Sequence, residues 1–171
     1  DGEMACGEFG PGRMAEPAEI VVAIETMLSS AAKPLAGKHV LITAGPTREP
    51  IDPVRVISNH SSGKQGYAIA EAARALGADV TLISGPVALA APLGVTLKRV
   101  ETAQDMLKAT EDALPADIAI FSAAVADWRV SHAADEKLKK RDDGATPTPS
   151  FTENPDILRT IATRKSKRPG V

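Results

Sequence analysis

The chain has 171 residues, of which 43% are hydrophobic and 25% charged, and its net charge is −2. This length and composition predict about one soluble globular domain and argue against a disordered chain or a general binder of nucleic acid. Aromatic residues make up only 3%, which argues against broad stacking platforms for single-stranded nucleic acid. Cys6 is the single cysteine, so the chain forms no intrachain disulfide, and we expect a reducing, cytoplasmic setting.

The N-terminal part of the chain is organised differently from the rest. Residues 1–15 are rich in Gly and Met and predict a loop, and Pro17 then opens an amphipathic helix. Residues 29–38 contain two Ser, a Pro and a Gly and predict a linker. The chain begins with Asp1 and closes, over residues 165–171, without a finished element, so we expect a fragment of a longer protein.

From residue 39 onward, β-branched runs alternate with helical patterns. We predict strands at 39–44, 79–84, 95–100 and 117–124, and helices at 64–76, at 102–114 and from 155 onward. The run 117–124 is the most apolar, so we expect it at the centre of the sheet. Asn154 before Pro155 predicts the cap of the last helix. The alternation predicts a three-layer, Rossmann-like α/β fold, with a mostly parallel sheet and helices on both faces.

Ligands of such sheets bind beyond the carboxyl ends of the strands, where three loops of this chain have unusual content. The first loop, residues 45–66, separates a strand from its helix by about twenty residues, where two to six are typical. It ends in Ser61, Ser62, Gly63 and Lys64 directly before the helix. Hydroxyls, backbone amides and a lysine at a helix N-terminus are typical of an anion site. The alternative is a polar helix cap.

The second and third loops also carry candidate groups. Residues 123–129 are mostly small, which lets a ligand approach the backbone, and Asp127 is suited to holding a ribose hydroxyl or a metal. The alternative is a capping Asp beside a packed Trp128. The third segment, residues 135–143, carries Lys137 in a run of charges that would ordinarily be a solvated face. Its position after the Asp127 loop favours a phosphate contact.

Three segments together resemble a known family. The runs ITAGPTREPIDPVRVISNHSSGKQGYAIA (42–70), AAVADWR (123–129) and EKLKK (136–140) resemble phosphopantothenoylcysteine synthetase, the ligase half of a bifunctional bacterial coenzyme A enzyme. The run ACGEFGPGRMAEP (5–17) resembles the end of the other half, a flavin-dependent decarboxylase. The resemblance is specific because motifs of both halves occur in this chain, in the order in which the two halves follow each other in the bifunctional enzyme.

The resemblance implies a domain division and a reaction. Residues 1–32 would be the decarboxylase tail, 33–38 a linker and 39–171 a ligase domain that is incomplete at its C-terminus. The ligase would use CTP and Mg²⁺ to activate 4′-phosphopantothenate as an acyl-cytidylate, and the amine of cysteine would then displace CMP. The absent decarboxylase half would use FMN. The resemblance also implies a homodimer through the ligase domain, a higher oligomer in the full-length parent, and neither nucleic acid nor membrane as partner.

The resemblance also assigns roles to single residues. Asn59 would act on the acyl-cytidylate, Ser61 to Lys64 would line the phosphate or substrate end, Lys137 would contact the nucleotide, and Cys6 would be the decarboxylase proton donor. The remaining nucleotide-binding residues would be Phe121, Ser122, Ala123, Asp127, Pro155, Asp156, Ile157 and Leu158. No ligands for Mg²⁺ are assigned, because no carboxylate cluster marks them and the nucleotide phosphates can supply most of the coordination.

Two other interpretations stay open. A generic Rossmann-like domain would bind NAD(P) or a sugar nucleotide, although Gly45-Pro46 stands where a glycine fingerprint would follow the first strand. A non-catalytic regulatory module is disfavoured by the net charge and by the scarcity of aromatic residues. The choice of nucleotide separates the three: CTP for the ligase, NAD(P) for the second and neither for the third. On the resemblance, we expect this chain alone to be an incomplete ligase.

Overall fold

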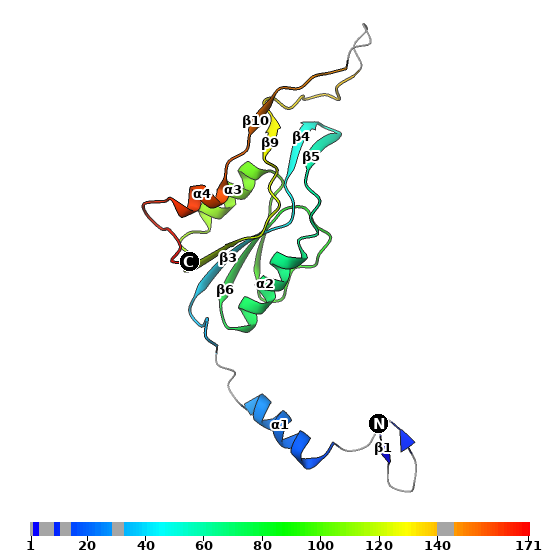
Figure 1. The fold of residues 1–171 in the computed structure, drawn as a ribbon, viewed down its shortest axis with the longest axis vertical. Coiled ribbons are helices and arrows are strands. Elements are labelled where there is room, and N and C mark those ends of the chain that lie inside the picture. The colour runs from blue at the N-terminus through cyan, green and yellow to red at the C-terminus, as the bar shows by residue number, and fades with distance from the viewer. Residues whose placement is uncertain (1, 4–8, 11–14, 29–32, 140–145) are drawn as a thin grey trace. The chain divides into compact units, whose positions relative to one another are not determined.

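The computed structural model describes residues 2–3, 9–10, 15–28, 33–139 and 146–171 (Figure 1). The chain divides into two compact units, Asp1–Lys33 and Pro34–Val171. Within the described residues, no helix combines the length and the apolar character needed to cross a bilayer.

The first unit contains two short strands and one helix. Strand β1 (Gly2–Glu3) pairs antiparallel with β2 (Phe9–Gly10), and helix α1 spans Pro17–Leu28. The helix predicted here is confirmed. Pro17 occupies its first position, where the missing backbone N–H would have had no partner within the helix. Cys6, the predicted proton donor of the decarboxylase, lies outside the described residues.

A four-stranded parallel sheet forms the centre of the second unit, with the strand order β7-β6-β3-β8. The strands are β3 (His39–Ala44), β6 (Asp79–Ser84), β7 (Thr96–Arg99) and β8 (Ile118–Phe121). The predicted α/β fold with a parallel sheet is therefore confirmed.

The expected position of the most apolar strand was wrong. Strand β8 lies at one edge of the four-stranded sheet, and β3 and β6 lie at its centre. All four side chains of β8 are only half-buried, whereas β3 is buried from Val40 to Ala44. Residues 169–171 run along the outer side of β8, where Ala119 donates its N–H to the Val171 carbonyl at 2.9 Å. The strand is apolar because its side chains pack against the cores on both faces of the sheet, although it lies at an edge.

Helices cover both faces of the sheet, as predicted. Helix α2 (Lys64–Ala75) packs its Tyr67 and Ala70 against one face, and α3 (Ala103–Asp112) and α4 (Ile157–Ala162) pack against the other. Successive strand residues point to opposite faces. The two cores consequently interleave along each strand: Val40, Ile42, Val80 and Leu82 face α2, and Leu41 and Ile83 face α3 and α4.

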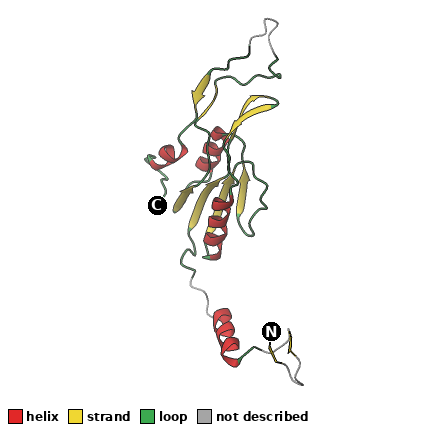
Figure 2. Ribbon diagram, turned by 45° about the vertical axis from the view of Figure 1, so that its right-hand side comes forward, coloured by secondary structure: helices red, strands yellow, loops and turns green. Residues whose placement is uncertain are grey.

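Two antiparallel hairpins stand beyond the carboxyl ends of the sheet strands (Figure 2). The first consists of β4 (Arg48–Asp52) and β5 (Arg55–Ser58), and the second of β9 (Trp128–Val130) and β10 (Phe151–Glu153). The long loop predicted at residues 45–66 is thus interrupted by a hairpin. Its turn closes because the Asp52 carboxylate accepts hydrogen bonds from the two backbone amides that follow Pro53.

The last helix begins later than predicted. Asp156, not Asn154, is its N-cap, and Asp156 Oδ1 accepts the N–H of Arg159 at 2.8 Å. Asn154 is occupied elsewhere, since its Nδ2 donates to the Ala126 carbonyl at 2.9 Å. The Asn154 Oδ1 that would cap the helix instead accepts a hydrogen bond from Arg129 Nη1 at 3.2 Å, which leaves the cap to Asp156.

Candidate functional site

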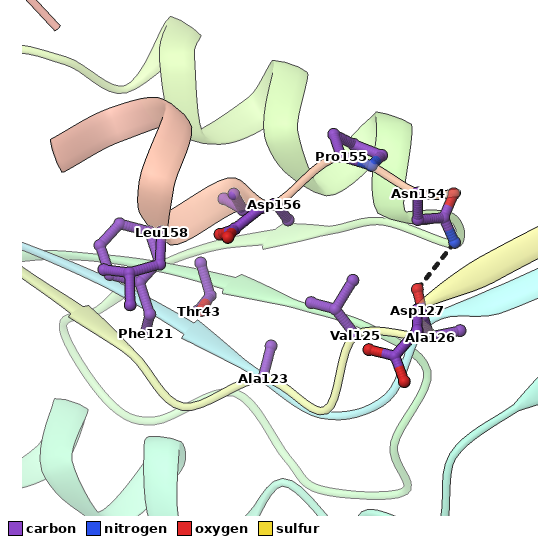
Figure 3. A pocket seen from close by; sticks show the side chains of 11 residues that line it. Thr43, Phe121, Ala123, Val125, Ala126, Asp127, Asn154, Pro155, Asp156 and Leu158 are labelled. Carbon is purple, nitrogen blue, oxygen red and sulfur yellow. Dashed lines mark hydrogen bonds between the residues drawn. The ribbon is translucent and has the colours of Figure 1, made fainter. Parts of the chain in front are cut away.

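A cavity of about 360 Å³ lies at the carboxyl ends of β3 and β8, between the loop that follows β8 and the start of α4 (Figure 3). Its lining residues are Thr43, Phe121, Ala123, Val125, Ala126, Asp127, Asn154, Pro155, Asp156, Ile157 and Leu158. The carboxyl end of a parallel sheet is where α/β proteins bind ligands. The cavity therefore lies where the topology predicts a site.

Two segments far apart in the sequence meet in this cavity. Most of the predicted nucleotide-binding residues line it, namely Phe121, Ala123, Asp127, Pro155, Asp156, Ile157 and Leu158. Ser122 does not, because its side chain lies on the other face of the chain and donates to the Thr43 carbonyl at 2.6 Å. Ser122 Oγ also borders Gly66 of α2, so this residue joins the sheet to the helix behind the cavity.

The cavity has a polar end and an apolar end. Figure 3 shows Phe121 and Leu158 together at one end, and Asp127 and Asn154 at the other. Asp127 is exposed to solvent. A flat apolar ring fits the first end, and hydroxyl groups that donate hydrogen bonds fit the carboxylate at the second.

Buried Thr47 shapes the loop that forms the cavity floor. The Thr47 side chain accepts the N–H of Ala126 at 3.0 Å, and its own N–H donates to the Ala124 carbonyl at 3.3 Å. Ala124 in turn donates to the Gly45 carbonyl at 2.8 Å. The loop after β8 is therefore fixed by the segment after β3 and does not depend on its own side chains for its shape.

Asn59 reaches the same loop from the end of β5. Its Nδ2 donates to the Val125 carbonyl at 3.0 Å, and Val125 lines the cavity. The predicted catalytic amide is thus adjacent to the cavity, with its donor directed at the cavity wall. The geometry brings Asn59 together with the predicted nucleotide segments, although residue 59 does not itself line the cavity.

The predicted anion-binding run lies at the start of α2. Gly63 is the N-cap and has a φ of 72°, a left-handed conformation that favours glycine. A Cβ there would lie 3.0 Å from Val87 Cγ1. Ser61 Oγ accepts the Gly63 N–H at 3.4 Å and Ser62 Oγ accepts the Lys64 N–H at 3.5 Å. Both serine hydroxyls therefore help to form this turn.

Lys137 does not line the cavity. It is exposed, on a segment that lies against β4, where Ala134 donates its N–H to the Ile51 carbonyl at 2.9 Å. No group of three or more His, Cys, Asp or Glu side chains is placed to hold a metal ion within the described part of the chain.

Sequence reasoning missed four of the lining residues: Thr43, Val125, Ala126 and Asn154. Thr43 could have been found, because it lies near the carboxyl end of a predicted strand. Val125 and Ala126 lie inside the loop at residues 123–129, whose small residues were expected to let a ligand approach the backbone, but neither was named as a nucleotide-binding residue. Asn154 was predicted as a helix cap, and its bond to the Ala126 carbonyl could be identified only in three dimensions.

Residues 35–171 match the model of a family described as the DNA/pantothenate metabolism flavoprotein C-terminal domain. The chain belongs to this family. A relative from Vibrio vulnificus, named Coenzyme A biosynthesis bifunctional protein CoaBC, is 52% identical over 169 residues, which cover 98% of this chain and 42% of the relative. The chain thus spans about two fifths of the length of the curated relatives it matches.

Solved structures agree with membership of the flavoprotein C-terminal domain family. The crystal structure of the C-terminal domain of CoaBC matches with a TM-score of 0.67 and 47% identity, covering 81% of this chain and 64% of that one. A mutant Cab2 in complex with phosphopantothenate-cysteine matches with a TM-score of 0.57 and 20% identity, over 87% of this chain and 68% of the other. The second likeness shows a shared fold. The resemblance of residues 5–17 to a decarboxylase stays a prediction.

Proposed function

We propose that this domain is the ligase of coenzyme A biosynthesis. It would activate 4′-phosphopantothenate with CTP as an acyl-cytidylate and couple it to cysteine, releasing pyrophosphate and then CMP. The observation that carries the proposal is the cavity at the carboxyl ends of β3 and β8, which gathers two of the predicted nucleotide segments. The family and the name of the Vibrio relative support the pathway. The parent protein would also decarboxylate the product with FMN.

The nucleoside of CTP would lie along the cavity. Its base would contact Phe121 and Leu158 at the apolar end, and a ribose hydroxyl would donate to Asp127 at the polar end. The small side chains of Ala123 and Ala126 leave room for the ligand to contact the backbone between these ends. Shape and polarity support a nucleoside as the ligand, and the resemblance favours cytidine among nucleosides.

The reaction would proceed in two displacements. The carboxylate of phosphopantothenate attacks the α-phosphorus of CTP and pyrophosphate leaves, while the Lys137 ammonium offsets negative charge on the phosphates. The amine of cysteine then attacks the acyl carbon, CMP leaves and the amine loses a proton. Asn59 would donate its amide N–H to the oxyanion of the second step. Ser61 to Lys64 would bind the phosphate end of the substrate.

Mg²⁺ would enter this site with the nucleotide. The described residues provide no cluster of three ligands for it, so the phosphates of CTP would supply most of its coordination. The ion would offset charge on the phosphates when bound. The roles proposed for Asn59 and Lys137 do not depend on where it is held.

The proposal is tested by isothermal titration calorimetry of this chain with CTP, ATP, GTP and NAD in the presence of Mg²⁺. CTP should release heat and the other three should not. Phe121→Ala should weaken CTP binding about 5- to 150-fold, because a base in contact with an aromatic ring gains about 1–3 kcal/mol. Leu93→Ala is the matched control, since Leu93 is 97% exposed and outside the cavity. Binding of NAD in place of CTP would contradict the proposal.

A further inference from the structure

The Asp52 carboxylate is buried at the turn of the first hairpin and accepts hydrogen bonds from two parts of the chain. Its side chain is 0% exposed. Oδ1 accepts the backbone N–H groups of Val54 at 3.0 Å and Arg55 at 2.9 Å, which closes the turn. Oδ2 accepts Arg55 Nε at 2.9 Å and the N–H of Leu138 at 3.1 Å. One carboxylate therefore connects the hairpin to a segment remote in sequence.

Arg55 contacts the backbone of the same residue, Leu138, at its carbonyl. Its Nη2 donates to the Leu138 carbonyl at 2.7 Å and also to Asp52 Oδ2. The N–H and the carbonyl of Leu138 are thus both bonded to an ion pair whose members also bond each other. The guanidinium of arginine is suited to this arrangement, because its donors point in fixed directions in one plane.

Closing the hairpin does not require these contacts to Leu138. The turn is already closed by the two amides on Oδ1. The bonds from Oδ2 and Arg55 Nη2 to Leu138 are additional, and they use a buried charge and one arm of a guanidinium. These bonds fix the backbone of residues 137–139. In this segment the exposed Lys137 and Lys139 are the neighbours of Leu138 in the sequence.

We propose that Asp52 and Arg55 are positioning residues, which fix the backbone at Leu138 so that Lys137 is presented to the phosphates of the nucleotide. This inference rests on the function proposed above, in which Lys137 contacts CTP. The action of Asp52 and Arg55 passes through the hydrogen bonds to the N–H and the carbonyl of Leu138, so it depends on the Asp52 carboxylate and on the paired donors of the Arg55 guanidinium.

The first measurement detects the contact itself. Hydrogen exchange of the Leu138 amide is followed by NMR in the unmodified chain and in Asp52→Asn, with CTP absent. The Asn side chain retains one oxygen and presents an NH₂ group where Oδ2 stood, so it cannot accept from both Leu138 and Arg55. We expect the Leu138 amide to exchange at least about tenfold faster, since one charge-assisted bond accounts for at least this factor. Amides of β3 should stay strongly protected, which shows that the variant is folded.

The second measurement is a double-mutant cycle on CTP affinity, determined by calorimetry with Mg²⁺ for Asp52→Asn, Lys137→Ala and the double variant. We expect Asp52→Asn to weaken CTP binding about tenfold. It should have no further effect once Lys137 is alanine. Asp117→Asn is the matched control, because Asp117 also binds a lysine and a backbone N–H but does so at the amino end of β8. Arg55→Lys should give an affinity between those of the unmodified chain and Arg55→Met.

The outcomes separate the two proposals. Faster exchange at Leu138 together with a non-additive loss of CTP affinity supports positioning by Asp52. Additive losses in the cycle, or an Asp52→Asn variant that binds CTP as tightly as the unmodified chain, overturn it. If Lys137→Ala alone leaves CTP affinity unchanged, the proposed role of Lys137 is wrong and the positioning proposal fails with it. The exchange rate at Leu138 then still reports whether the contact exists.

Discussion

Close approach of backbones at single residues defines the sheet behind the site. At Gly66, a Cβ would lie 2.5 Å from Ala44 Cβ of β3 and 2.6 Å from Ser122 Oγ, in the loop that follows β8. The first turn of α2 can therefore contact β3 only if residue 66 has no side chain. Because the opposite side of this β3–β8 end forms the cavity, the packing of Gly66 also sets the position of the cavity wall.

Gly66→Ala should destabilise the second unit by about 1–3 kcal/mol, because the added methyl group overlaps atoms of Ala44 in β3 and of Ser122 in the loop after β8. The free energy of unfolding is measured by urea denaturation followed by circular dichroism. Gly170→Ala is the control, since a Cβ there meets only the Asp117 carbonyl at an ordinary 3.4 Å. Equal stability of the two variants would show that α2 moves away from β3 without cost.

The pKa of Asp52 lies well below its usual range. The side-chain hydrogen bond from Arg55 is the main cause, the backbone N–H groups of Val54 and Leu138 add to it, and burial opposes it. A carboxylate whose pKa is lowered by folding stabilises the folded state at every pH above its unfolded value of about 3.9. That contribution is lost as the pH falls through the lowered folded value.

The stability difference between the unmodified chain and Asp52→Asn should therefore be constant from pH 7 to about pH 5 and should shrink as the pH falls further. It is measured by urea denaturation at a series of pH values. Asp105→Asn provides a comparison at a carboxylate that serves α3 alone. A difference that grows on acidification would contradict the lowered pKa.

Some of the side-chain placements followed from the sequence and some did not. Phe121 and Ala123 share a cavity while Ser122 faces α2, as the two-residue period of a strand requires. Applying that period would have removed Ser122 from the predicted nucleotide set. The place of Lys137 could not be predicted, because the contacts that hold its segment involve the backbone of Leu138 and carry no side-chain signal.

At the scale of elements, the helix starts show how local and long-range contacts combine. Thr102 and Asp105 form the predicted capping box of α3, with Thr102 Oγ1 accepting the Asp105 N–H at 3.1 Å. Buried Glu49 of β4 adds to it, since its Oε1 accepts the N–H of Ala103 at 2.9 Å. The capping box could be predicted from the sequence because its residues lie within four positions of each other. The contact of Glu49 with Ala103 could not be predicted, because most of two βα units separate the two residues.

Thr102→Ala should lower the free energy of unfolding by about 1 kcal/mol, the usual cost of losing a cap. The helix should still form, because Glu49 keeps its bond to the first amide. Thr148→Ala, in an exposed loop, should change stability by less than about 0.5 kcal/mol. A loss in Thr102→Ala no larger than that of Thr148→Ala in thermal unfolding would mean that Glu49 alone is sufficient.

The elements with strong periodicity were predicted well. Strands β3 and β6 and the first turn of α2 match their predicted residues, since buried β-branched runs and an Ala-rich segment closed by Gly77 leave few alternatives. The hairpin at residues 48–58 was missed because Pro50 and Pro53 break the alternation that marks a strand. Its turn is closed by a side chain, Asp52, rather than by a recognisable turn sequence.

At the scale of the whole chain, the second compact unit, Pro34–Val171, contains the central sheet and both hydrophobic cores. The boundary falls between Lys33 and Pro34, and the family model begins at residue 35. Leu35 already belongs to the second unit, where it packs on the core that faces α2 and donates its N–H to the Leu76 carbonyl at 3.0 Å. The proposed division at residues 32 and 38 stays a prediction, as does the homodimer.

A chain of residues 34–171 should therefore fold alone, with a melting temperature within about 2 °C of that of the full chain. Differential scanning calorimetry measures both. Starting the chain at residue 39 instead should lower the melting temperature, because it removes Leu35 and the Lys38 contact to Asp117. A large loss on removing residues 1–33 would show that the two units stabilise each other.

The hydrogen bonds of Asp52 and Arg55 to the Leu138 backbone have a consequence for how related sequences would vary. Asp52 and Arg55 contact the backbone N–H and carbonyl of this residue, not its side chain. Natural selection can therefore act strongly at positions 52 and 55 while leaving position 138 free to drift. Proline is the one residue excluded on hydrogen-bond grounds, because it has no N–H to donate. A search for functional residues by side-chain identity would overlook position 138, even though it is the contact through which the pair acts.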